Sequence, residues 1–262
     1  MPALTAASAS ALDAVLLSPR CGFSLLTLVE LAGQAVALAT LAAYPPSAHP
    51  RVLVVCGSGN QGLDGLAAAR WLATLSYAPH VALPRPPARA AEAALSASLR
   101  AQFLAAAPGA AVLGAVPPPS ALAADYDVIV DALFGFSFVG PPRPPLAAAL
   151  EAMIAVQRGG GGGGGGGGNA SAVDAAGAPG RTLPIVSVDI PSGWHVELGD
   201  EAGGGLRPDA LVSLSAPKLC SSKFSGAHFL GGRFVPAVIA EEFEITEYTN
   251  AYTGGELVAR LS

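Results

Sequence analysis

The chain has 262 residues, of which 52% are hydrophobic and 13% are charged, and its net charge is −5. This length allows one large buried core, and the acidic balance excludes the basic face that nucleic-acid binding requires. Alanine supplies much of the hydrophobicity, and no stretch of about eighteen strongly apolar residues predicts a membrane span.

The cysteines and the first residues bear on the compartment. Cys21, Cys56 and Cys220 are far apart and form no Cys-x-x-Cys pair, which argues for a reducing compartment and against a disulfide framework or a zinc site. Residues 1–20 carry Arg20 as their only basic residue, so we expect no targeting segment. A cytoplasmic location follows, with the mitochondrion and the plastid as alternatives.

Predicted helices alternate with predicted strands along the chain. Hydrophobic periodicity predicts helices at residues 25–41, 64–75, 88–107 and 146–157. Short apolar runs predict strands at 52–56, 80–83, 111–116, 128–133 and 185–190, one that begins at residue 210, and one at 231–236. This order is typical of an α/β fold in which helices cover both faces of a mostly parallel central sheet.

We expect one domain over residues 1–262, interrupted by an insertion. Gly159–Gly168 is an uninterrupted run of glycines, which loses much entropy on ordering and buries nothing. We therefore expect a disordered surface loop at about 158–180.

The segment Val52–Gly65 combines a strand, a glycine-rich turn at Gly57–Asn60 and a helix. With Asp64 near the helix start, its carboxylate suits the helix dipole and can cap free N–H groups. Such a turn before a helix N-terminus is a ready site for a phosphate or another anion.

The same turn matches known nucleotide-binding patterns only in part. Gly57, Gly59 and Gly62 have the spacing of the dinucleotide-binding fingerprint, but the next strand ends in Pro84-Arg85-Pro86 instead of the acid that holds a ribose. Arg85 is the residue that could meet a 2′-phosphate. No Lys-Ser or Lys-Thr follows the glycines, so a P-loop is excluded, and an NAD(P)-dependent oxidoreductase is a disfavoured alternative.

Four polar segments follow predicted strands and should converge at one edge of the sheet, where such sheets bind ligands. They are the Gly57–Asp64 turn, Asp131 with the loop 134–140, Asp189 with Ser192, and Lys218. Asp131 lies in an apolar run, where its carboxylate must either cap backbone N–H groups or meet a ligand or cation.

These residues suggest a division of roles. Asn60, Gln61, Asp131 and Ser192 offer oxygen ligands, which suit a hard cation better than zinc. Of the two carboxylates Asp131 and Asp189, one would balance the cation and the other would move protons. No Ser-His-Asp triad is present, and His195 and His228 are expected to make local hydrogen bonds.

Several long segments resemble one family, in the same order as in that family. They are LVELAG (28–33), VLVVCGSGNQGLDGLAAARWL (52–72), YDVIVDALFGFSFVGPPRPP (126–145), PIVSVDIPSGWHVE (184–197) and LVSLSAPKLCSSKFSGAHFLGGRFVP (211–236). The chain resembles the NAD(P)H-hydrate epimerases, also called apolipoprotein A-I-binding proteins, over residues 20–240 apart from the glycine-rich insertion.

The resemblance implies a Rossmann-like three-layer sandwich that interconverts the R and S hydrates of NADH and NADPH, NADHX and NADPHX. A partner dehydratase accepts only the S form, one potassium ion binds per subunit, and a homodimer is expected. Our own hypothesis is that Asp189 is the catalytic acid/base at the hydrated carbon of the nicotinamide ring. The implied substrate contacts are Asn60, Gln61, Gly62, Leu63, Asp64, Gly135, Phe136, Ser137, Phe138, Val139, Gly140, Pro141 and Asp189. The implied potassium ligands are Gln61, Asp131 and Ser192.

Two positions depart from the family pattern Asn-Asn-Gly-Gly-Asp. Gln61 is longer than asparagine by one methylene, and Leu63 replaces glycine. If residue 63 needs a positive φ, or if its backbone must approach a phosphate, a side chain there obstructs the site. Leu63 therefore favours an alternative in which the chain is a binding or regulatory protein with weakened catalysis.

Overall fold

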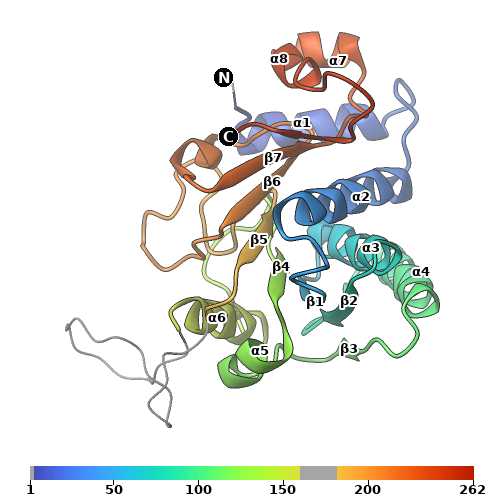
Figure 1. The fold of residues 1–262 in the computed structure, drawn as a ribbon. Coiled ribbons are helices and arrows are strands. Elements are labelled where there is room, and N and C mark those ends of the chain that lie inside the picture. Colours follow the sequence, from blue (N-terminus) through green and yellow to red (C-terminus); the bar gives the residue numbers. More distant parts are fainter. Residues whose placement is uncertain (1–2, 160–181) are drawn as a thin grey trace.

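A computed structural model describes residues 3–159 and 182–262, and an eight-stranded sheet forms its centre (Figure 1). The order is β3-β2-β1-β4-β5-β6-β7-β8, and only β8 is antiparallel to its neighbour. The strands are β1 (Arg51–Cys56), β2 (Ala78–Ala82), β3 (Val112–Leu113), β4 (Val128–Ala132), β5 (Ile185–Val188), β6 (Ala210–Leu214), β7 (Ala227–Gly231) and β8 (Val258–Arg260). The order reverses between β1 and β4, where doubly wound sheets bind ligands.

Helices cover both faces of the sheet and one end of it (Figure 1). α2 (Leu25–Ala43), α3 (Asn60–Thr74) and α4 (Ala90–Ala106) lie on one face, and α5 (Pro119–Asp125) and α6 (Leu146–Gln157) lie on the other. α1 (Ala6–Leu17), α7 (Ala237–Glu242) and α8 (Thr246–Thr249) pack together beside β7 and β8, and a 3-10 helix, η1 (Leu219–Lys223), follows β6. The predicted three-layer α/β architecture is confirmed.

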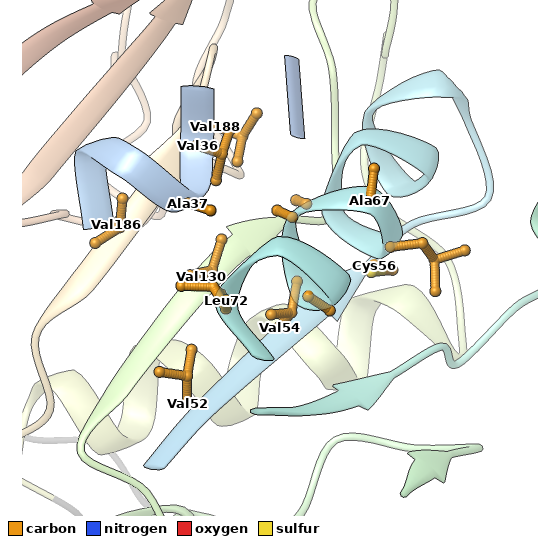
Figure 2. Close-up of a cluster of buried hydrophobic side chains, with 14 of the residues drawn as sticks. Val36, Ala37, Val52, Val54, Cys56, Ala67, Leu72, Val130, Val186 and Val188 are labelled. Atoms are coloured by element: carbon orange, nitrogen blue, oxygen red, sulfur yellow. The ribbon is translucent and has the colours of Figure 1, made fainter. Parts of the chain in front are cut away.

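The two faces of the sheet form separate halves of the core. Val52 and Val54 of β1 pack with α2 and α3 in the cluster of Figure 2, whereas Leu53 and Val55 face α5 and α6. Because both faces are covered, the central strands are mainly apolar and show no regular polar alternation, although Asp131 lies in β4 and Ser187 in β5.

Helix α2 holds the first helical layer together. A Cβ on Gly33 would lie 2.5 Å from the Ala67 Cβ, so glycine permits the close approach of α2 to α3. Glu30 pairs with Arg70, and the Trp71 indole donates to it at 3.4 Å, which gives Glu30 a structural role between the two helices. Among the residues that the structure describes, α2 is the one helix long and apolar enough to span a membrane, contrary to the sequence expectation, but its buried face packs in this core.

Some element boundaries differ from prediction. α3 begins at Asn60, so Asp64 lies in its second turn and does not cap it. A Cβ on Gly62 would lie 2.0 Å from the Gly57 oxygen, so Gly62 lets the first turn of α3 pack closely against the backbone at the end of β1.

The last predicted strand, 231–236, is wrong, because Gly232 turns with φ +100° and β7 ends at Gly231. The elements α1, α5, α7, α8 and β8 were not predicted. The insertion expected at about 158–180 lies almost wholly outside the described residues.

Candidate active site

A cavity of about 570 Å³ opens at the carboxyl ends of β1, β4, β5 and β6. Its walls come from α1, α2, the β1–α3 turn, the loop after β4, and the residues that follow β5 and β6. This is the edge at which the sequence predicted that polar segments would meet. Asp64, Asp189 and Lys218 lie in its lining, as does the loop 134–138.

The turn between β1 and α3 presents backbone N–H groups to the cavity. Gly59 is the N-cap of α3, and no side chain caps the helix there. Ser58, Asn60 and Gln61 line the cavity beside it. Free N–H groups at a helix N-terminus attract anions, so this end of the cavity suits a phosphate.

The backbone at Gly57 fixes where this turn lies. The Gly57 N–H donates to the Ala132 carbonyl at 2.9 Å, and a Cβ on Gly57 would lie 1.9 Å from the Leu133 oxygen. Only glycine allows this contact, which holds the turn against the loop that follows β4.

Asp189 and Lys218 form a buried ion pair in the cavity wall. Lys218 Nζ lies 2.6 Å from Asp189 Oδ1, and the lysine and aspartate side chains are 5% and 6% exposed. Lys218 also donates to the Leu214 and Ala216 carbonyls at 2.9 and 3.2 Å, and its Nζ lies 5.7 Å from the centre of the Phe136 ring.

Asp189 follows β5 in an unusual backbone conformation. Its φ is +60°, a left-handed conformation that aspartate tolerates better than most residues. The Leu214 N–H donates to Asp189 Oδ1 at 3.1 Å. Since strained backbone gathers at functional sites, this turn supports a role for Asp189 in chemistry.

Three more carboxyl groups line the same cavity, Asp64 of α3, Asp13 of α1 and Glu92 of α4. Burial raises the pKa of Asp64 well above its usual range, and the charges of Asp189 and Asp13 raise it further. Burial likewise raises the pKa of Asp13, which Lys218 opposes and Asp189 reinforces. Asp189 is therefore paired with a lysine, whereas Asp64 and Asp13 resist ionisation.

Asp131 lies outside the cavity lining, in a hydrogen-bonded network. It accepts from Ser187 Oγ at 2.8 Å, from Ser192 Oγ at 2.6 Å, and from the N–H groups of Ser192 and Leu133 at 2.9 and 3.3 Å. Burial raises the pKa of Asp131, while these hydrogen bonds lower it. Asp131 thus caps backbone N–H groups, one of the two roles expected from the sequence.

The implied substrate contacts divide into two groups. Those that line the cavity are Asn60, Gln61, Asp64, Gly135, Phe136, Ser137, Phe138 and Asp189. Those that do not are Gly62, Leu63, Val139, Gly140 and Pro141. Phe138 stacks on Phe134 with ring centres 4.1 Å apart, which orders the loop after β4 at the cavity mouth.

Leu63 does not obstruct the site, contrary to the concern raised by the sequence. It lies within α3, is 1% exposed in the hydrophobic core, and is not among the residues with positive φ. A glycine at this position would only remove core packing. The departure at residue 63 therefore gives no support to a protein with weakened catalysis.

Asp13 was not predicted as a site residue, because the composition of residues 1–20 bears only on a targeting segment. The missed signal was a lone acid in an Ala- and Leu-rich stretch that Thr5 caps by accepting from the Ser8 N–H. His195 and His228 make local hydrogen bonds, as predicted. His195 Nδ1 accepts from the N–H groups of Glu197 and Leu198, and His228 Nε2 lies 2.8 Å from Ser213 Oγ.

Comparisons with known proteins agree with this geometry. The family described as "YjeF-related protein N-terminus" matches residues 25–220. An NAD(P)H-hydrate epimerase of Anopheles gambiae is 39% identical over 92% of this chain and 91% of its own length. The crystal structure of yeast ynu0 superposes with a TM-score of 0.82 at 30% identity and covers both chains fully.

One similar protein is much longer than this chain. The pyridoxine/pyridoxamine 5′-phosphate oxidase 1, chloroplastic, of Arabidopsis thaliana is 40% identical over 98% of this chain, but the match covers 44% of that protein. The chain thus spans less than half of that relative. The oxidase activity in the name describes the longer protein and is not a property of this chain.

Proposed function

Because the chain belongs to the family of YjeF-related protein N-termini, we propose that it interconverts the R and S hydrates of NADH and NADPH. The relative from Anopheles gambiae is named NAD(P)H-hydrate epimerase, and the match covers nearly all of both chains. The observation that carries the proposal is the Asp189–Lys218 pair in a cavity that also contains the open N-terminus of α3. The chain is an isomerase that repairs a damaged cofactor.

The arrangement of groups in the cavity supports one orientation of the substrate. The N–H groups at the start of α3 bind a phosphate, which places the hydrated nicotinamide ring toward Asp189 and Lys218. Lys218 Nζ and the Leu214 N–H both bond to Asp189 Oδ1, and no hydrogen bond among the described residues uses Oδ2. Asp189 Oδ2 is therefore the atom that exchanges a proton with the oxygen bound to the hydrated carbon.

A coupled assay tests the proposal. Purified R-NADPHX is incubated with the protein and an S-specific dehydratase, and the recovered NADPH is followed by its absorbance. We expect recovery faster than the spontaneous rate. Recovery at the spontaneous rate, with the hydrate bound by calorimetry, would instead support the binding-protein alternative.

The oxidoreductase alternative lacks its central residue. The segment after β2 is Leu83-Pro84-Arg85, so no acid is present to hold a ribose. An oxidoreductase would transfer hydride to a second substrate, whereas the epimerase changes only the configuration of a hydrated ring.

Arg85 is expected to separate the two substrates. It lies in the cavity lining just after β2, where its guanidinium can reach the 2′-phosphate of NADPHX. We expect Arg85→Ala to raise the KM for NADPHX about tenfold and to leave the KM for NADHX nearly unchanged. Steady-state kinetics on both hydrates provide the measurement, with Arg100→Ala of the exposed face of α4 as the control; equal effects on both hydrates would refute this role.

A potassium ion is also part of the proposal. Asp131, Ser192 and Gln61 offer only oxygen ligands, and Asp131 is fully buried with no cationic side chain paired to it in the described ranges. A Cβ on Gly135 would lie 2.9 Å from Gln61 Oε1, so glycine leaves room for this oxygen. The donor set fits the ion, whose charge would balance Asp131 and steady the loop after β4.

We expect potassium to stabilise the folded chain. At about ten times its Kd the ion adds roughly 1.4 kcal/mol, which raises the Tm by a few degrees. Differential scanning calorimetry in potassium chloride and in choline chloride gives the comparison. Ser192→Ala should abolish the difference, and an equal Tm of the wild type in both salts would contradict the site.

The partners and the location are expectations that accompany this function. An S-specific dehydratase would consume the product, and analytical ultracentrifugation would reveal the expected homodimer. We propose the cytoplasm as the location, with the mitochondrion and the plastid as alternatives. The name of the Arabidopsis relative includes the word chloroplastic, which favours the plastid among the alternatives.

A further inference from the structure

Asp64 is a partly buried carboxyl group in the cavity wall, and the mechanism above assigns it no chemical step. Its side chain lines the cavity, and it makes no hydrogen bond or ion pair within the part of the chain that the structure describes. A carboxyl group that lines a ligand cavity without a protein partner is open to a partner in the ligand, because removal of water by the ligand would otherwise leave it unsatisfied.

We propose that Asp64 is the second catalytic carboxyl group, which donates a proton to the leaving hydroxyl while Asp189 accepts one from the entering water. Asp13 acts as a positioning residue that keeps Asp64 neutral. This inference rests on the proposed function and names a second acid/base group for the same reaction.

The step balances in atoms and charge. Neutral Asp64 protonates the hydroxyl on the hydrated ring carbon, the carbon–oxygen bond breaks, and water leaves as the ring nitrogen lone pair stabilises the cation. Water then forms a new carbon–oxygen bond on the opposite face and gives its proton to the Asp189 carboxylate. One proton has passed from Asp64 to Asp189, and exchange with water in the cavity restores both groups.

The surroundings divide these two roles. Lys218 Nζ lies 2.6 Å from Asp189 Oδ1, so Asp189 has a cationic partner in the cavity wall. Asp64 has no such partner, and burial, Asp189 and Asp13 all raise its pKa against a smaller opposing effect of Lys218. Two carboxyl groups in such different surroundings, at one cavity, are the usual arrangement of an acid/base pair.

The charged groups around Asp64 come from three elements besides its own helix. They are Asp13 of α1, Asp189 after β5 and Lys218 after β6. On β1 the buried thiol of Cys56 also lies near, and burial together with the Asp64 charge raises its pKa. Of these groups, Asp13 is a carboxyl group that forms no part of the Asp189–Lys218 ion pair, so its substitution leaves that pair's hydrogen bond in place.

Asp64→Asn tests the acid. The substitution keeps the shape of the side chain but removes its proton, and we expect kcat to fall about 100-fold or more. Calorimetric binding of the hydrate and the Tm should stay close to wild type, Asp64→Glu should recover part of the rate, and Asp125→Asn on the exposed end of α5 is the matched control. Full kcat in Asp64→Asn, with an active wild type, would overturn the inference, whereas an inactive wild type would overturn the proposed function.

Asp13→Asn tests the positioning role through the pH profile. Neutral Asp64 is lost as the pH rises through its pKa, so kcat falls on the alkaline side. Removing the Asp13 charge should move this alkaline limb to lower pH by about half a unit to one unit. A merely structural role would lower kcat equally at all pH values, and an unmoved limb would overturn the assignment.

Discussion

Asp189→Asn is expected to lower kcat for R-NADPHX by about 100- to 10,000-fold, because it removes the group that exchanges protons with the ring. Asparagine suits the test, since residue 189 has φ +60° and asparagine adopts this conformation readily. Lys218 would keep its bonds to the Leu214 and Ala216 carbonyls, so its charge is not left without acceptors. Stopped assays that separate the two epimers by chromatography measure the rate.

The control for Asp189→Asn is substrate binding. The hydrate contacts several segments of the cavity, so calorimetry should give a Kd within a few-fold of wild type. Asp209→Asn changes a carboxylate just before β6, which accepts from the Ile185 N–H at 2.9 Å, and should leave kcat unchanged. If Asp189→Asn retained full turnover, the acid/base assignment would be wrong.

The second large effect concerns stability. Leu63→Gly is expected to lower the free energy of unfolding by about 3–6 kcal/mol, since it empties a core position and places glycine in a helix. Leu63 is 1% exposed and packs in the cluster between the sheet and α2. Although this substitution recreates the family's glycine, it should not raise kcat. Urea denaturation gives the stability, and turnover is measured well below the midpoint.

Leu104→Gly is the matched control, because Leu104 lies in α4 but is 43% exposed. It should cost only the loss of helix propensity, about 1 kcal/mol. A gain in kcat for Leu63→Gly, or equal costs for the two variants, would show that residue 63 acts on the site and not in the core.

The architecture was predictable because its signals are local. The apolar runs of β1, β4, β5 and β6 and the periodicity of α2 and α6 are continuous in the sequence. The start of α3 was not predictable, since glycine is normally a poor helix residue. Only the tertiary structure explains Gly62 there, because a Cβ at this position would lie 2.0 Å from the Gly57 oxygen. The end of β7 likewise depends on the turn at Gly232.

The site was predictable where parallel topology brings strand ends together, as at Asp189 and Lys218. Which carboxyl groups face the cavity was not predictable. Sequence order cannot distinguish Asp64, which lines the cavity, from Asp131, which lies outside its lining. Asp13 was missed for a different reason. Its helix packs beside β7, and only the tertiary structure brings residue 13 close to residues 64 and 189.

Equilibration of the pure hydrates tests epimerisation most directly. Isolated R-NADPHX and isolated S-NADPHX are each incubated with the purified protein, with no dehydratase present, and the epimers are separated by chromatography. We expect both samples to reach the same ratio of epimers faster than without protein, with no gain or loss of total hydrate. If neither sample changes its configuration faster than it does without protein, the chain is not an epimerase.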